Sequence, residues 1–201
     1  LARRTLAPVG IAPVLLKGTA YVALGLDCAA GRQIGDLDIL LPEDRLDAAE
    51  AALLAAGWVW LKTDPYDQLY YREWMPELPP LAHSERGTMI DVHHRLLPRT
   101  HRARPDAAAM IARAVGVGGG ADGRALLALD PVDRLIHAAA HALADGDLTG
   151  GLRNLWDIHG LAADLDPAGW TALDARAREW GLSTAVHRAL RLAHRLYGTA
   201  L

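Results

Sequence analysis

The segment Gly35-Asp36-Leu37-Asp38-Ile39-Leu40-Leu41 alternates carboxylates with apolar residues and then continues as an apolar run. Side chains of a strand alternate between its two faces, so Asp36 and Asp38 share one face and the apolar residues beside them point into the core. Two carboxylates this close repel each other, and in a partly buried cleft the repulsion is costly unless a cation offsets it. Carboxylate oxygens suit Mg²⁺. The segment therefore predicts a strand that carries metal ligands.

A third carboxylate, Asp91, lies in a second predicted strand over residues 88–94, between apolar neighbours. If the two strands are adjacent, three carboxylates converge. Such a cluster can hold two Mg²⁺ ions and support in-line phosphoryl displacement. His93 would share the face of Asp91 and could orient a substrate or the metal ligands. A packed strand histidine is the alternative.

A short apolar run, Val14 to Leu16, meets the turn Lys17-Gly18-Thr19, after which residues 19–28 favour a helix. Backbone N–H groups at such a turn, with the Thr19 hydroxyl and the Lys17 charge, could hold a triphosphate at the positive end of the helix. The motif is weak alone and gains weight from its place before the Asp-x-Asp strand. Arg32 could also contact triphosphate or be a plain surface arginine.

The remaining pattern predicts an α+β fold, a mixed sheet flanked by helices, with an α-helical C-terminal domain. Prolines make residues 63–81 unreadable, and residues 116–123 are too rich in glycine to pack a core, so we expect a loop there. The boundary at that loop gives an α+β domain over 1–115 and a helical domain over 124–201. Further elements are expected by their spacing as helices at 44–56, 106–115, 132–144, 151–163, 168–180 and 183–197 and a strand at 58–62.

Composition narrows the function classes. The chain has 201 residues, a net charge of −3 and a pI near 6.3, so it lacks the positive field typical of proteins that grip long nucleic acids. No apolar stretch is long enough to span a membrane, and one cysteine, Cys28, excludes an internal disulfide and fits a reducing compartment. We expect a cytoplasmic protein without long nucleic-acid or membrane partners.

The order of glycine turn, Asp-x-Asp strand and distal strand Asp resembles the nucleotidyltransferase superfamily of DNA polymerase beta. More narrowly, the chain is similar over about residues 20 to 180 to the bacterial family described as uncharacterised nucleotidyltransferases. This narrower likeness is carried by Leu16-Lys17-Gly18, Arg32, Gly35 to Leu40, Leu53 to Trp58, Ile90 to His93 and Leu152 to Ile158. Thr19 replaces the usual Ser, and the gap from Gly18 to Asp36 is longer than in compact members. The resemblance is therefore weaker for the phosphate-binding turn Lys17-Gly18-Thr19, called here the phosphate cradle, than for the carboxylates.

The resemblance implies a polymerase beta-like nucleotidyltransferase that uses two Mg²⁺ ions and a nucleoside triphosphate such as ATP. It would transfer a nucleoside monophosphate to a hydroxyl of a small molecule, peptide or protein and release pyrophosphate. Asp36, Asp38 and Asp91 would be the metal and catalytic residues, and Asp91 would help activate the nucleophile. Nucleotide contacts would come from Lys17, Gly18, Thr19, Arg32 and Gly35, with His93 as an accessory residue. The alternative is a non-catalytic nucleotide- or partner-binding module that retains the fold.

Three other patterns have simpler explanations. His137 and His141 share a helix face without the glutamate of a zinc protease, which favours a structural or nucleotide-facing role over zinc. Arg153 and Asp157 fit an intrahelical ion pair. A basic run at Arg95, Arg99, Arg102 and Arg104 could hold phosphate or be a solvated loop. We also expect Asp36→Asn with Asp38→Asn to leave folding intact, because it relieves repulsion.

Overall fold

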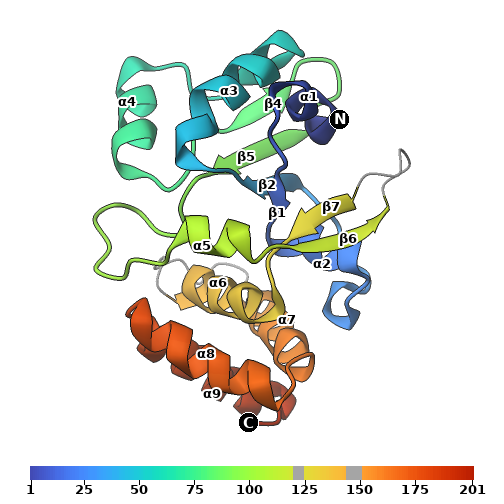
Figure 1. The fold of residues 1–201 in the computed structure, drawn as a ribbon, viewed down its shortest axis with the longest axis vertical. Coiled ribbons are helices and arrows are strands. Elements are labelled where there is room, and N and C mark those ends of the chain that lie inside the picture. The colour runs from blue at the N-terminus through green and yellow to red at the C-terminus, as the bar shows by residue number, and fades with distance from the viewer. Residues whose placement is uncertain (120–124, 144–150) are drawn as a thin grey trace.

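A computed structural model describes residues 1–119, 125–143 and 151–201. Within that part of the chain, seven strands form one mixed sheet in the order β3-β4-β5-β2-β1-β7-β6 (Figure 1). Apolar and β-branched residues dominate the inner strands, as expected where both faces are covered. The strands are β1 (Val14–Leu15), β2 (Asp36–Leu40), β3 (Trp58–Trp60), β4 (Leu81–His83), β5 (Met89–His93), β6 (Val115–Gly119) and β7 (Ala125–Ala128).

Pairing at the centre of the sheet determines where the carboxylates lie. Strand β2 runs parallel to β5 and antiparallel to β1, and β1 runs parallel to β7. Outside β5, β4 and then β3 continue the sheet with antiparallel pairing. The two strands predicted to bear carboxylates are therefore direct neighbours.

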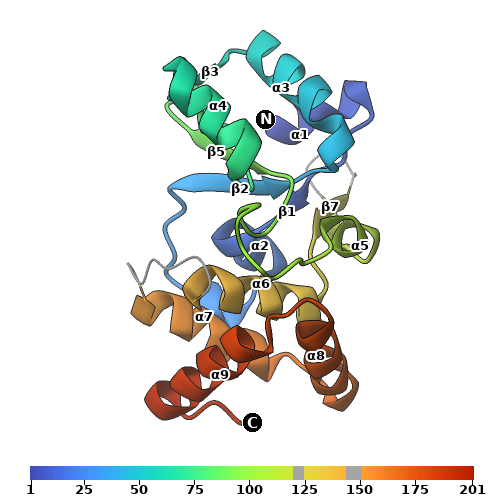
Figure 2. The ribbon, with the colours of Figure 1, turned by 90° about the vertical axis from the view of Figure 1, so that its left-hand side faces the viewer.

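Helices cover the sheet and build the C-terminal half. Figure 2 shows α1 and α3 near the top of the molecule, α4 in front of β5, α2 below β2, and α6 to α9 beyond α2. Their bounds are α1 (Ala2–Leu6), α2 (Lys17–Leu24), α3 (Leu46–Ala55), α4 (Pro65–Trp74), α5 (Ala107–Ala112), α6 (Pro131–Leu143), α7 (Gly151–Ala163), α8 (Pro167–Glu179) and α9 (Ser183–Tyr197). Short 3-10 turns lie at Ala7–Val9, Asp27–Ala29 and Glu43–Arg45.

Local chemistry accounts for the helix ends. Asp64 and Asp166 each accept a backbone hydrogen bond at the start of α4 and α8, and each is followed by a proline, which fits the first helical turn. Gly198 ends α9 in the left-handed conformation, at a positive φ that few residues other than glycine adopt. These signals are readable in the sequence, and the C-terminal helices begin and end close to their predicted positions.

The α+β architecture with C-terminal helices is confirmed, and the structure adds to or differs from the sequence analysis in three places. Residues 63–81, for which the sequence predicted no helix or strand, contain the whole of α4 and the start of β4. The expected glycine-rich loop is wrong for 116–119, which belong to β6, while 120–123 lie outside the described residues. Since β7 pairs with β1, the sheet extends past residue 124, where the helical domain was predicted to begin. The division into domains remains a prediction.

One hydrophobic core joins the sheet to the helical half. Buried side chains run continuously from Leu40 and Val92 in the sheet to Ile136 of α6, Ile158 of α7 and Leu190 of α9. Among the described residues, no helix combines the length and apolarity needed to cross a bilayer.

Candidate active site

The three predicted carboxylates lie on one face of two adjacent strands. The register pairs Asp38 of β2 directly with Asp91 of β5, and it pairs Asp36 with Met89. Paired residues on adjacent strands share a face and lie roughly 5 Å apart between Cα atoms, and residues two apart on a strand share that face as well. The structure therefore brings Asp36, Asp38 and Asp91 together.

Asp38 is the most enclosed of the three. One of its oxygens, Oδ1, accepts hydrogen bonds from Lys17 Nζ at 2.6 Å and from the ring Nε2 of His93 at 3.0 Å. Burial by itself would raise the pKa of Asp38, but the bond from His93 and the charge of Lys17 hold it well below its usual range. No hydrogen bond among the described residues uses the second oxygen, Oδ2. Asp38 is thus held as a carboxylate with one oxygen left for a ligand.

Asp91 has the opposite electrostatics. Burial raises its pKa, the charges of Glu77 and Asp38 raise it further, and the result is a pKa of about 6. No lysine or arginine of the described residues forms an ion pair with it. A carboxyl that titrates this close to neutrality can exchange a proton during a reaction.

The predicted phosphate cradle lies beside these carboxylates. Helix α2 begins at Lys17, and Lys17 has a φ of 45°, a left-handed value unusual for a residue other than glycine. The first N–H groups of a helix have no partner within it. Thr19 Oγ1 donates to the carbonyl oxygen of Asp36 at 3.3 Å, which ties the first turn of α2 to the start of β2. Lys17 therefore lies on the carboxylate face, whereas Thr19 lines a pocket together with Leu37 and Ile39 of the opposite face of β2.

Arg32 and Gly35 are placed differently from the cradle. Arg32 forms an ion pair with Asp157 of α7 and lies over the ring of Tyr21, with its guanidinium carbon 5.5 Å from the ring centroid. A Cβ on Gly18 would approach Arg32 Nε to 2.3 Å, so glycine is required for this packing. Gly35 is exposed ahead of β2. Arg32 therefore joins α2 to the helical half, and nucleotide contact by Arg32 or Gly35 stays a prediction.

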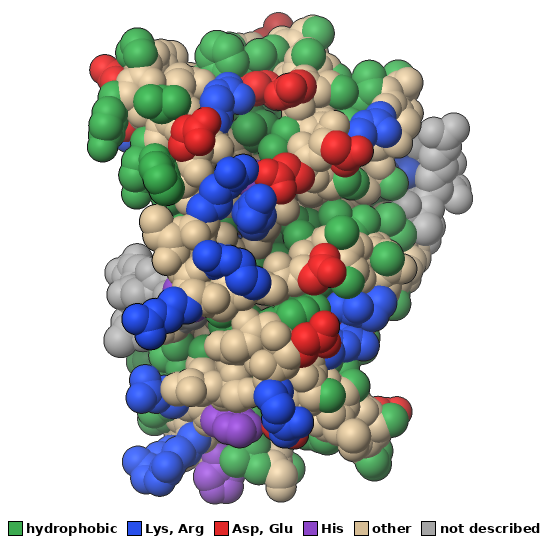
Figure 3. Space-filling model, turned by 60° about the vertical axis from the view of Figure 1, so that its left-hand side comes forward, with side chains coloured by type: hydrophobic (Ala, Val, Ile, Leu, Met, Phe, Trp, Pro, Cys, Tyr) green, Lys and Arg blue, Asp and Glu red, His purple; other side chains and the backbone are tan. Residues whose placement is uncertain are grey.

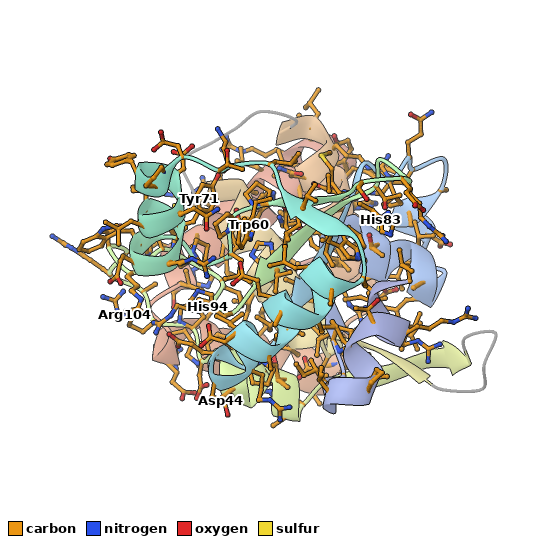
Figure 4. The ribbon with its side chains drawn as sticks, turned by 90° about the horizontal axis from the view of Figure 1, so that it is seen from above. Asp44, Trp60, Tyr71, His83, His94 and Arg104 are labelled. Carbon is orange, nitrogen blue, oxygen red and sulfur yellow. The ribbon has the colours of Figure 1, made fainter. Side chains whose placement is uncertain are left out.

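Two residues that the sequence did not single out also belong to the site. Glu77 lies beside β5, where it forms an isolated bridge with His93, and its Oε2 is 3.2 Å from His93 Nε2. Burial raises the pKa of Tyr71 on α4, and the charges of Glu77 and Asp91 add to the rise. Figure 4 shows Tyr71 on the inner side of α4. Both residues fall in the proline-interrupted segment, where no periodicity marked them.

The donor set fits Mg²⁺ that completes its coordination on a nucleotide. Carboxylate oxygens are the right chemistry, and Asp38 Oδ2 has no protein partner in the described residues. Yet no group of three or more His, Cys, Asp or Glu side chains in the described ranges is gathered closely enough to enclose a metal by itself. Mg²⁺ commonly binds through one or two carboxylates together with substrate phosphates, so an open set is the expected form without nucleotide.

The remaining candidates differ in their surroundings. His137 is buried in α6, and burial, with the charge of Lys17 adding to it, lowers its pKa well below the usual value. Arg153 pairs with Asp157 at 3.4 Å as expected for i,i+4 neighbours. Within the basic run, Arg95 and Arg99 both bind Glu43, although Lys and Arg side chains still form a band down the face in Figure 3.

Comparison with solved structures identifies the fold. The antibiotic-resistance factor ANT(2'')-Ia in solution matches with a TM-score of 0.58 and 14% identity over 93% of this chain and 94% of that chain. The crystal structure of ANT(2'')-Ia with adenylyl-2''-tobramycin matches with a TM-score of 0.54 and 12% identity over 89% of this chain and 93% of that chain. At these identities the likeness shows a shared nucleotidyltransferase fold.

Comparison at the sequence level identifies the family. None of the curated proteins compared with the sequence matches it. The model of the family described as "Uncharacterised nucleotidyltransferase" matches residues 2–198, nearly the whole chain. The expected resemblance is thereby confirmed, and the chain belongs to this uncharacterised nucleotidyltransferase family.

Proposed function

We propose that this protein transfers a nucleoside monophosphate from a nucleoside triphosphate such as ATP to a hydroxyl of a small acceptor and releases pyrophosphate, with Mg²⁺ bound at Asp36, Asp38 and Asp91. The observation that carries the proposal is the direct pairing of Asp38 with Asp91 on adjacent parallel strands. Family membership supports nucleotidyl transfer as the reaction class. A cytoplasmic location, where nucleoside triphosphates are abundant, is part of the proposal.

Bound Mg²⁺ would supply charge neutralisation of the triphosphate and activation of the acceptor oxygen. Asp36 and Asp38 would provide carboxylate ligands, with Lys17 and His93 fixing the orientation of Asp38. The N–H groups at the start of α2 would donate to phosphate oxygens, supported by Thr19. In this arrangement the phosphates of the nucleotide would supply the remaining ligands of Mg²⁺.

Asp91 would accept the proton of the acceptor hydroxyl. As that oxygen attacks the α-phosphorus, a new O–P bond forms, and the bond from the α-phosphorus to the oxygen that bridges it to the β-phosphate breaks. Pyrophosphate leaves with the electron pair, and the proton passes to the Asp91 carboxyl and from there to solvent.

A small acceptor is favoured over a long nucleic acid. The net charge of −3 gives no general attraction to a polyanion, and two arginines of the basic run are already paired with Glu43. The similar structure solved with adenylyl-2''-tobramycin is consistent with an acceptor of this size.

Calorimetric titration with ATP, with and without Mg²⁺, combined with an assay of pyrophosphate release over an acceptor pool, tests the proposal. We expect ATP to bind only with Mg²⁺, Mg²⁺ to bind only weakly without ATP, and Asp38→Asn to abolish binding. Asp44→Asn is the matched control, because Asp44 is exposed and outside the site. Equal ATP affinity without Mg²⁺, or in Asp38→Asn, would contradict the metal site. Mg²⁺-dependent binding without pyrophosphate under any acceptor would instead favour a non-catalytic binding module.

A further inference from the structure

The side of the site opposite the phosphate cradle carries a further carboxylate, Glu77, and adjoins helix α4. Across the sheet, the cradle after β1 is followed by β2 with Asp38, then β5 with Asp91 and His93, and then Glu77. A triphosphate held at the start of α2 would leave the far end of this row for the second substrate. Glu77 and α4 are therefore the elements that an acceptor would meet.

Helix α4 forms an exposed aromatic wall at that end. None of its residues is buried, and Tyr66, Tyr70 and Trp74 are 72%, 42% and 50% exposed. The hydrophobic side chains at the upper left of Figure 3 cover this helix. Helices of soluble proteins normally bury their apolar side chains, so a helix that exposes several aromatic rings beside a reactive carboxylate indicates a binding surface.

The rings of α4 lead toward the catalytic carboxylates. Tyr66 stacks on Tyr70 with their centroids 6.2 Å apart, and Tyr70 meets Tyr71 edge-on, also at 6.2 Å. The C-terminal end of α4 is tied to the segment after β5, because the N–H of Arg99 donates to the carbonyl oxygen of Trp74 and the N–H of His94 donates to that of Pro76, next to Glu77. The three tyrosines thus form a continuous series of rings along α4, on the helix whose end adjoins Glu77.

Charge selects the kind of acceptor. Among the described residues, neither Glu77 nor Asp91 forms an ion pair with lysine or arginine. The carboxylate of Glu77 contacts the ring of His93. The formal charges of two Mg²⁺ ions and one nucleoside triphosphate cancel, so these ligands would leave the carboxylate excess at the acceptor end in place. Carboxylates beside tyrosine rings favour an ammonium group, through ion pairing and cation–π attraction.

We propose that Glu77 and the tyrosines of α4 form the acceptor subsite, and that the acceptor is a small alcohol bearing an ammonium group near its attacking hydroxyl. This inference rests on the proposed function, because only a transferase has an acceptor substrate. The subsite itself, however, requires neither nucleotide nor turnover. Its ligand chemistry can therefore be tested on the chain alone.

Choline and its neutral carbon isostere, dimethylbutanol, provide a matched pair of probes, since both carry a primary hydroxyl and a similar bulky group. NMR titration of the ring-labelled tyrosines should show the signals of Tyr70 and Tyr71 shifting with choline at roughly tenfold lower concentration than with the isostere. Glu77→Gln should weaken choline binding about tenfold and leave the isostere unchanged. Glu85→Gln, an exposed glutamate outside the site, is the control.

Equal response to choline and the isostere, choline shifts confined to other tyrosines, or unchanged choline affinity in Glu77→Gln would each overturn the proposal. Correct folding of Glu77→Gln is checked by unchanged signals of Tyr21 in α2 and Tyr197 in α9, which lie outside the proposed subsite. Because no nucleotide is present, these outcomes are independent of the ATP titration. Failure of the subsite and failure of the transferase reaction can therefore be told apart.

Discussion

At the scale of single residues, Lys17 and His93 offset the charge of Asp38, so repulsion between the aspartates is not the main feature of the site. The sequence shows two aspartates on one strand face and suggests mutual repulsion, but the structure surrounds Asp38 with Lys17 and His93. The two aspartates therefore differ. Asp36 is exposed at the start of β2, whereas Asp38 is buried and forms an ion pair. The expectation that replacing both would leave folding intact is revised accordingly.

Asp38→Asn should lower the free energy of unfolding by about 2–3 kcal/mol, because it leaves the Lys17 ammonium half-enclosed without its carboxylate. Asp36→Asn should leave stability unchanged while also losing Mg²⁺-dependent ATP binding. Urea denaturation of both variants measures the difference. Equal stability of the two would show that the Lys17 contact contributes nothing to folding.

Gly18→Ala should destabilise the protein by ~1–3 kcal/mol, since its Cβ would clash with Arg32, which Asp157 and Tyr21 hold in place. Gly35→Ala is the matched control, with no atom within 4 Å of the added Cβ. Thermal unfolding of the two variants provides the measurement. A Gly18→Ala protein as stable as the control would mean that Arg32 is free to move.

Stability should fall as the pH is lowered from about 6.5 to about 4, in part through His94. Burial lowers the pKa of His94 to about 4, whereas an unfolded histidine titrates near 6.5. The unfolded chain therefore binds more protons in this window, and acid favours unfolding by ~1–3 kcal/mol. His94→Gln should flatten the pH dependence, measured by urea denaturation at several pH values. His187→Gln, at an exposed site, should not.

At the scale of elements, the sequence predicts what has a regular period and misses what tertiary contacts determine. The Asp-x-Asp strand and the four C-terminal helices follow from alternation and helical spacing, and their boundaries agree within a few residues. Helix α4 was missed because it has no buried stripe. It is attached instead by polar contacts, in which Glu50 accepts hydrogen bonds from Arg72 and from Trp60 Nε1.

Arg72→Met should release α4 while leaving the sheet intact, because the helix buries no side chain of its own. Hydrogen exchange should become faster across Pro65 to Trp74 and remain slow in β2 and β5. Lys62→Met is the control, since its contact with Asp67 is long and exposed. Unchanged protection of α4 would show that backbone and aromatic contacts suffice to hold it.

At the scale of the whole molecule, contacts between distant segments assemble the site. Arg32 reaches Asp157 across 125 positions of sequence, and Glu77 meets His93 through a single isolated bridge. Neither contact has a periodic signature, so the sequence predicted the carboxylates with Lys17 and His93, but neither Glu77 nor the ion pair of Arg32 with Asp157. The β6–β7 addition to the sheet was missed because the glycines of β6 indicate a loop, and because β7 is a four-residue apolar segment without alternation.

The account depends on Asp36, Asp38 and Asp91 binding divalent cations together with a nucleotide. A crystal structure with Mn²⁺ and a non-hydrolysable ATP analogue tests this most directly, since the anomalous signal of Mn²⁺ locates each ion. We expect Mn²⁺ on the carboxylates of β2 and β5, with the triphosphate at the first turn of α2. Nucleotide bound elsewhere, or Mn²⁺ that does not touch Asp38, would contradict it.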